Sequence, residues 1–153
     1  MRKLALILLI FTLLSSTIIS CGRYENGPAF SLRSAKSRAV GEWVLTDLLV
    51  NDKSEQALLE NESSSKLILN EDGSYSYKNY ATRSTAERCG IWTFGEDKTE
   101  LILTEIDTIK GNVEHSYRIT RLTNKEMWLL NGNDEYINID DLIERRFEKQ
   151  SNK

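Results

Sequence analysis

Residues 66–78 read Lys66-Leu67-Ile68-Leu69-Asn70-Glu71-Asp72-Gly73-Ser74-Tyr75-Ser76-Tyr77-Lys78. The first part is aliphatic, whereas the part after Gly73 alternates between polar and aromatic residues. A glycine-containing turn between two such parts is typical of a β-hairpin, because glycine readily adopts positive φ. Alternation in a strand also turns both tyrosines to the same face of the sheet. This segment therefore predicts antiparallel β-structure.

The same pattern recurs on both sides of this hairpin. Further strands are predicted at residues 41–50, 88–94, 99–106, 113–122, 127–130 and 143–148. About eight strands joined by short turns predict an all-β fold, an antiparallel up-and-down barrel of one domain over residues 41–149. No helical pattern within residues 41–135 is long enough to supply the crossover helices of a parallel sheet.

Three other segments are less regular. A short helical turn with a serine N-cap is expected within residues 31–38, and another helical turn around residues 56–59. Residues 135–149 are the hardest to interpret, because Ile139–Ile143 could extend a strand or start a helix.

The N-terminus has the proportions of a signal peptide. Arg2 and Lys3 precede an apolar run of 11 residues, Leu4–Leu14, whereas a membrane-spanning helix needs about 20. The run leads into Ile18-Ile19-Ser20-Cys21, which resembles the lipobox of bacterial lipoproteins. This resemblance implies cleavage between Ser20 and Cys21, a diacylglycerol on the Cys21 sulfur, and usually a further acyl chain such as palmitate on the new amine.

The lipobox divides the chain into a signal peptide (1–20), a tether with a short helical turn (21–40) and the barrel (41–149). The alternative is an ordinary signal peptide whose cleavage site happens to precede a cysteine. Because Gly22 does not resemble an inner-membrane retention signal, we expect the outer membrane, with the leaflet left open.

Charge argues against a nucleic-acid partner. Without residues 1–20 the chain has 18 basic and 23 acidic residues, a net charge of −5, whereas nucleic-acid binders carry a basic surplus. The tether is locally basic, and its four basic residues either rest on anionic head groups or form a solvated helical face. These residues are Arg23, Arg33, Lys36 and Arg38.

The start of the first predicted strand, Gly41-Glu42-Trp43, follows a short helical turn. Glycine, any residue and tryptophan in this position resemble the first motif of lipocalins, and together with the lipobox and the length the chain looks like the lipocalin-like lipoproteins of Gram-negative bacteria. The resemblance implies that Trp43 closes the base of the barrel and packs under a C-terminal arginine, Arg145 or Arg146. A second Gly-x-Trp stands at 90–92.

The chain also departs from the lipocalin pattern. The second motif, a Thr-Asp-Tyr-like turn, is missing, although residues 133–136 resemble it loosely. The disulfide common in secreted members is absent as well, since acylation of Cys21 leaves Cys89 as the sole thiol. These departures favour a shorter relative, whose role in the family is generally unassigned.

Catalytic and metal chemistry find little support. His115 is the only histidine, and no Gly-x-Ser-x-Gly motif accompanies it. One histidine and one remaining cysteine cannot build a conventional structural zinc site. Asp140 and Asp141 are adjacent, so in a strand they would point to opposite faces. We therefore expect no enzyme, no catalytic residue, no metal and no cofactor.

Ligand binding is supported by the placement of aromatic residues. Alternation turns six of them inward together: Trp43, Tyr75, Tyr77, Trp92, Phe94 and Tyr117. Such a lining suits a small apolar ligand with a few polar contacts. The alternative is that the six side chains simply fill the barrel, in which case the protein would be a structural or adaptor lipoprotein that binds another envelope protein.

One further motif concerns modification. Asp107-Thr108-Ile109 resembles the acceptor sequence of a bacterial O-glycosylation system, with Thr108 as the modified residue. A chance match is also expected in a chain so rich in aspartate and threonine.

Overall fold

The structure is a computed structural model that describes residues 23–27, 31–62, 64–79, 86–106, 111–131 and 141–151. Within these residues, nine strands form one antiparallel sheet and two short helices accompany it. The helices are α2 (Ala35–Ala39) and α3 (Gln56–Glu62). The strands are β1 (Gly41–Val50), β2 (Lys53–Ser54), β3 (Lys66–Leu69), β4 (Ser74–Asn79), β5 (Ala86–Phe94), β6 (Glu100–Glu105), β7 (Val113–Leu122), β8 (Glu126–Asn131) and β9 (Ile143–Lys149).

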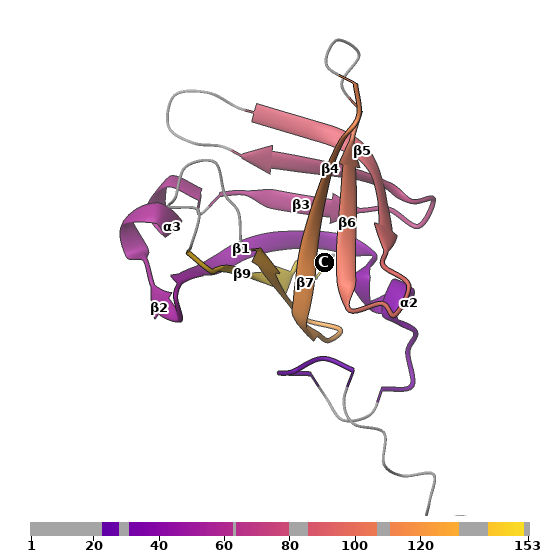
Figure 1. Ribbon diagram of the computed structural model, residues 1–153, viewed down its shortest axis with the longest axis horizontal. Coiled ribbons are helices and arrows are strands. Elements are labelled where there is room, and N and C mark those ends of the chain that lie inside the picture. Colours follow the sequence, from indigo (N-terminus) through magenta and orange to yellow (C-terminus); the bar gives the residue numbers. More distant parts are fainter. Residues whose placement is uncertain are drawn as a thin grey trace, which may run out of the picture.

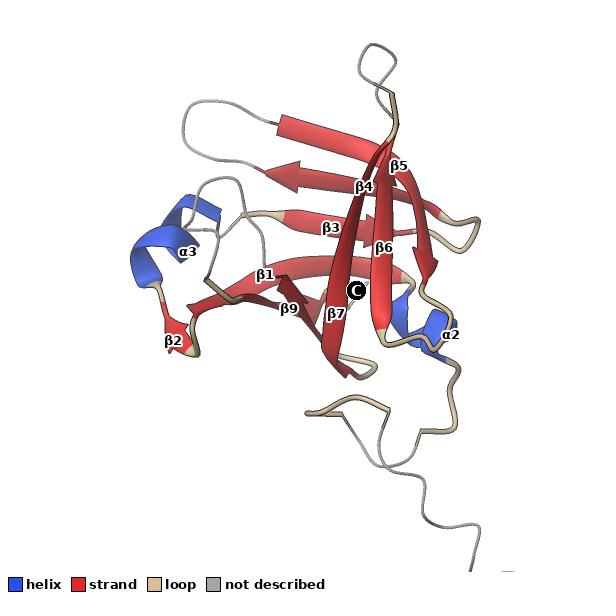
Figure 2. Ribbon diagram, viewed as in Figure 1, coloured by secondary structure: helices blue, strands red, loops and turns tan. Residues whose placement is uncertain are grey.

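The sheet closes on itself to form a barrel. Each strand from β3 to β8 pairs with the next one along the chain, and β1 pairs with both β3 and β9. Eight strands therefore form the cylinder seen in Figure 1, and the two-residue β2 adds to β1 outside it. This arrangement confirms the predicted all-β, lipocalin-like barrel, and Figure 2 shows how little of it is helical.

Most predicted elements are found where the sequence placed them. β1, β3 and β7 have the predicted bounds, and the other barrel strands differ by one or two residues at an end. β2 was not predicted. The first helix is shorter than expected and begins after Ser34, whose hydroxyl accepts a hydrogen bond from the Ser37 amide. Ile143 starts a strand, whereas residues 132–140 lie outside the described residues.

The two ends of the barrel differ, and we name them by the helix found there. The α2 end is where β1 starts at Gly41, and the α3 end is where β1 finishes at Val50. In Figure 1, α2 lies at the lower right and α3 at the left. The turn between β7 and β8 is at the α2 end, because β7 finishes there.

The main hydrophobic core occupies the α2 end and the middle of the barrel, and Leu48 and Ile143 are also buried towards the α3 end. Its largest completely or almost completely buried members come from almost every strand: Trp43, Leu45, Leu67, Leu69, Leu101, Leu122, Met127 and Phe147. Burying one such side chain contributes roughly 1.5–3 kcal/mol. In the described part of the chain the only cysteine is Cys89, so this core stands without a disulfide.

One prediction about the tether is wrong. Arg38 is not available to membrane head groups, because only 7% of it is exposed and its Nη1 donates to the Leu122 carbonyl (2.9 Å). Arg38 lies on the side of α2 that faces the barrel, so its side chain reaches the last residue of β7. Arg23, Arg33 and Lys36 are exposed.

Several other predictions fall outside the described residues. These are the signal peptide, the Ser20–Cys21 cleavage site, the acylated Cys21 and the glycosylation candidate Thr108. Among the helices that are described, none has the length and apolar character needed to cross a bilayer.

Candidate functional site

The six predicted aromatic residues all belong to the barrel interior. Trp43, Tyr75 and Trp92 are buried, with 4% or less of each exposed, whereas Tyr77, Phe94 and Tyr117 are partly buried against the same core. Strand alternation therefore brings them together. They are spread along the barrel, however, so the two ends are described separately.

At the α2 end, Trp43 is fixed by the end of a helix. Its indole Nε1 donates to the Ala39 carbonyl at 2.7 Å, and the Lys149 ammonium lies 4.7 Å from the ring centroid. Lys149 Nζ also donates to the carbonyls of Arg38 (2.7 Å) and Val40 (2.6 Å). The last carbonyls of a helix have no partner within it, so Trp43 and Lys149 satisfy those of α2. Burial, with a smaller effect of the nearby Arg33, lowers the pKa of Lys149.

The predicted partner of Trp43 is therefore wrong. Neither Arg145 nor Arg146 covers this ring, because Trp43 pairs in register with Lys149 at the last position of β9. Arg146 points outward, where its guanidinium lies 4.0 Å from the centroid of Trp128. Arg145 faces inward but lies four residues from Lys149, towards the α3 end.

The glycines of both Gly-x-Trp motifs have a steric role. Gly41 has φ +143°, and a Cβ on it would lie 2.8 Å from Lys149 Cε. A Cβ on Gly90 would lie 2.0 Å from the Thr104 carbonyl oxygen on the neighbouring strand. The first glycine makes room for the lysine over Trp43, and the second permits a close approach of β5 and β6.

Trp92 is held in the same way as Trp43. Its Nε1 donates to the Asn70 carbonyl at 2.9 Å, and its ring meets Phe94 edge-to-face with centroids 5.5 Å apart. A buried indole needs a hydrogen-bond acceptor, and here the β3–β4 turn supplies one. Both tryptophans thus have their polar groups satisfied by the backbone.

At the α3 end the interior becomes polar around Arg145. Its Nη1 donates to Asn131 Oδ1 at 3.0 Å, and its Nε lies 3.5 Å from Glu62 Oε2. The side chains are mostly buried, with 13% of Arg145 and 24% of Glu62 exposed. Glu62 is the last residue of α3, a helix without a basic residue in its last turn, so Arg145 supplies the positive charge that this helix end favours.

Tyr77 adjoins this cluster, and Tyr75 lies on the same face of β4, two residues closer to the α2 end. Burial raises the pKa of Tyr77, and the hydroxyl of the completely buried Ser65 lowers it in part. The nearby charges of Glu62, Arg145 and Tyr117 have smaller effects on this pKa. Burial and, to a lesser extent, Glu105 raise the pKa of Tyr75 to about 12. Tyr75 and Tyr77 are therefore neutral at physiological pH, and their hydroxyls can donate hydrogen bonds.

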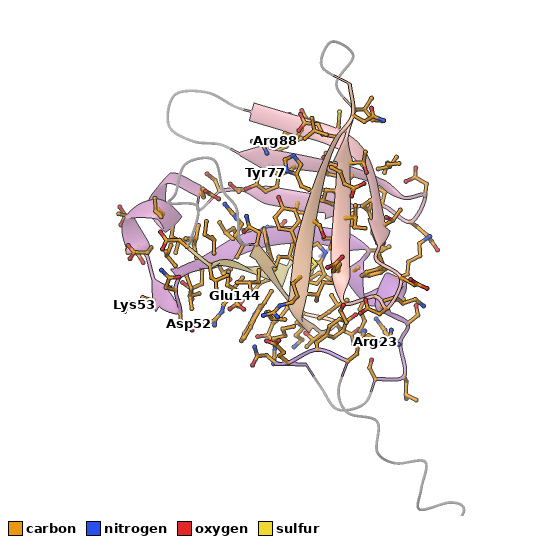
Figure 3. All side chains as sticks on the ribbon, in the orientation of Figure 1. Arg23, Asp52, Lys53, Tyr77, Arg88 and Glu144 are labelled. Atoms are coloured by element: carbon orange, nitrogen blue, oxygen red, sulfur yellow. The ribbon has the colours of Figure 1, made fainter. Side chains whose placement is uncertain are left out.

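A second group of charges lies on the opposite wall at the same end. Arg88 pairs in register with Tyr77, and Figure 3 shows the two side chains next to each other. His115 Nε2 lies 3.9 Å from Glu105 Oε2, on the face of β6 and β7 that includes Leu103. The α3 end therefore combines basic, acidic and hydroxyl groups, of which Arg88 is exposed.

The central residue of this cluster, Arg145, was named in the sequence analysis for a different role, and Glu62 and Asn131 were not named. Alternation from Phe147 would have placed Arg145 inside the barrel. The contact with Glu62 has no comparable signal, because it depends on how α3 folds back onto the sheet.

The arrangement offers groups that can bind a small molecule. Among the described residues, no three His, Cys, Asp or Glu side chains are grouped so that they could hold a metal ion. The polar cluster offers one guanidinium and several hydroxyls beside an apolar wall, which suits a molecule with a polar and an apolar part.

The fold and this interior define the class of protein as an all-β, lipocalin-like barrel. No protein-family model matches the chain, and no curated protein matches its sequence significantly.

Proposed function

We propose that this protein is a membrane-anchored, lipocalin-like lipoprotein that binds a small, mainly apolar ligand inside the barrel. The ligand's apolar part would contact the aromatic and aliphatic side chains, and a polar, preferably anionic, group would meet Arg145. The observation that carries the proposal is a mostly buried polar cluster, Arg145 with Glu62 and Asn131, beside apolar side chains in one barrel interior.

The energetics of Arg145 support this proposal. A buried ion pair is often no more stabilising than well-packed hydrophobic residues of similar size, because both charges lose their hydration. A barrel that needed only a solid core would gain little from Arg145, Glu62 and Asn131 at inward-facing positions. A guanidinium is, however, well suited to bind a carboxylate or phosphate through two parallel hydrogen bonds.

The anchor completes the proposed function. Acylation of Cys21 would tether the barrel to a membrane of the cell envelope, and we expect the outer membrane. Two or three acyl chains hold a protein stably, whereas one chain binds only marginally. A Cys21→Ser variant should be released from membranes and should lack the acyl mass.

A second candidate function is an adaptor lipoprotein with a filled barrel, whose partner is another envelope protein. It is favoured by the α2 end, where Trp43, Leu101, Leu122 and Met127 have no exposed surface. In this case the polar cluster would only join α3 to the barrel, and no small molecule would enter.

Ligand binding is tested on delipidated protein by Trp fluorescence and melting shifts. The probes are a long-chain fatty acid, the alcohol of the same chain length, a sterol and a tetrapyrrole. We expect the acid to bind more tightly than the alcohol, and Arg145→Gln to weaken the acid by about tenfold, the loss expected for one charge-assisted contact.

The matched control is Arg146→Gln, because the neighbouring side chain points outward to Trp128. This variant should leave the affinity unchanged. Equal losses in both variants would contradict the role of Arg145. No response to any of the four probes, together with a co-purifying envelope protein, would favour the adaptor.

A further inference from the structure

The N-terminal segment, residues 23–27, packs against the α2 end. Only 4% of Tyr24 is exposed, and its side chain belongs to the hydrophobic core. The Asn26 amide donates to the Thr120 carbonyl at 2.8 Å, and Arg121 Nη1 donates to the Asn26 carbonyl. In Figure 1 this segment lies below the lower end of β7.

Arg38 links this segment to the barrel. Its guanidinium lies 5.6 Å from the Tyr24 ring centroid, and the same group donates to the Leu122 carbonyl. Arg38 is thus sandwiched between the segment and β7, where it is shielded from water. The ion pair between Arg118 and Glu25 (3.4 Å) contributes little to the attachment of this segment, because both side chains are more than half exposed.

The sequence places the proposed lipid very close to this contact. Cys21 precedes Tyr24 by three residues, and an extended chain spans at most about 3.6 Å per residue, so the acylated residue lies within roughly 11 Å of Tyr24. In contrast, β7 has ten residues and spans about 30 Å from its start near the α3 end to its finish at the α2 end.

From this geometry we infer that the barrel stands on the membrane with its α2 end against the head groups and its α3 end, with Arg145, directed away from the bilayer. The inference rests on the proposed acylation of Cys21. The buried Tyr24 and the backbone hydrogen bond of Asn26 hold residues 23–27 against the barrel. A ligand would then reach the polar cluster from the aqueous side.

The charges of the α2 end explain what kind of membrane surface it fits. Hydrogen bonds from Thr99 lower the pKa of Asp97, and Arg23 nearby lowers it further. Hydrogen bonds from Ser74 lower the pKa of Asp72, with a small contribution from Lys36. Arg23 and Lys36, both exposed, therefore lie near acidic side chains on this face, so a zwitterionic head-group layer suits it, and the orientation should not depend on salt or on anionic lipid.

The test uses the acylated protein in phosphatidylcholine vesicles that contain a head-group nitroxide lipid. In a Cys89→Ser background, a fluorophore is attached at Asn124→Cys, in the exposed β7–β8 turn, or at Glu114→Cys, on the exposed start of β7. We expect quenching at position 124 to be roughly threefold or more stronger than at position 114, because about 30 Å of strand separates the two ends. Adding phosphatidylglycerol or salt should not change this ratio.

Two variants of Tyr24 complete the experiment. Tyr24→Ala removes the ring that fixes the segment and should bring the two labels close to equal quenching, whereas Tyr24→Phe keeps the ring and the difference. Equal quenching in the parent protein, or an unchanged ratio in Tyr24→Ala, overturns the inference. Protein that does not stay on the vesicles at all overturns the proposed anchor as well, whereas retained protein with equal quenching leaves the anchor and the ligand site intact.

Discussion

The two ends of this barrel are built from the same alternating strands but are filled differently. At the α2 end, the Trp43 indole and the Lys149 ammonium both donate to backbone carbonyls, and the surrounding side chains have almost no exposed surface. At the α3 end, Arg145, Glu62 and Asn131 form a polar cluster beside the buried Leu48 and Ile143, and the side chains of the cluster remain partly accessible. The contrast suggests that one end supplies stability and that the other supplies recognition.

The largest effect is expected from Trp43→Ala at the α2 end. Removing a completely buried tryptophan typically costs about 3–5 kcal/mol, and here the Ala39 carbonyl also loses its donor. Denaturant unfolding measures the change. The control is Trp128→Ala, whose ring lies on the outer face between Arg121 and Arg146. If both variants lose the same stability, the contrast between inner and outer tryptophans is wrong.

A smaller effect is expected from Lys149→Met. Two carbonyls of the α2 region would lose the ammonium that they share, at a cost of about 1–3 kcal/mol. Lys125→Met serves as the control, since Lys125 is an exposed lysine at the same end. A melting temperature equal to that of the control would show that Lys149 does not cap α2.

The middle of the barrel should respond to alkaline pH. The pKa of Tyr75 is raised to about 12, compared with 10.0 for an ordinary tyrosine, so the folded state favours the neutral phenol. Its contribution to stability is complete below pH 10 and is lost as the pH rises from 10 to 12. We expect Tyr75→Phe to lose less stability than the parent over this range, as measured by urea unfolding at each pH. An equal or greater loss would contradict this explanation.

The smallest effect on stability is expected at the α3 end. Replacing both partners of the ion pair, in Arg145→Met with Glu62→Met, should change the free energy of unfolding by less than about 1 kcal/mol, because the lost attraction is offset by the lost desolvation cost. Ligand affinity should nevertheless fall. A loss of stability comparable to that of Trp43→Ala would place the α3 end in the structural core and favour the adaptor function.

Local pattern was sufficient to predict the barrel. The aliphatic and alternating segments around Gly73 specify a hairpin, and the same period predicts every strand of the cylinder. β2, which lies outside the cylinder, was not predicted, because Lys53 and Ser54 are polar and the strand has only two residues. The bounds of α3 were also only partly predicted, since four of its seven residues were expected to be helical.

The site was less predictable, since it depends on contacts between distant parts of the chain. The partner of Trp43 depends on the register between the first and last strands, which includes an irregularity between Leu45 and Asp47. The pairing of Glu62 with Arg145 depends on where α3 lies after the barrel has closed. Strand alternation predicts the aromatic lining and the inward position of Arg145, but it does not predict which side chains Trp43 and Arg145 meet.

The pairing of β1 with β9 has a consequence for how the chain reaches its final state. The ribosome makes β1 about a hundred residues before β9, its second neighbour in the barrel. Closing such a long loop is entropically costly and slow. Until Ile143–Lys149 arrives, both margins of the growing sheet carry unpaired amide and carbonyl groups that can recruit other chains. A truncation that removes this last strand should therefore aggregate during synthesis, even though the strand supplies only seven residues.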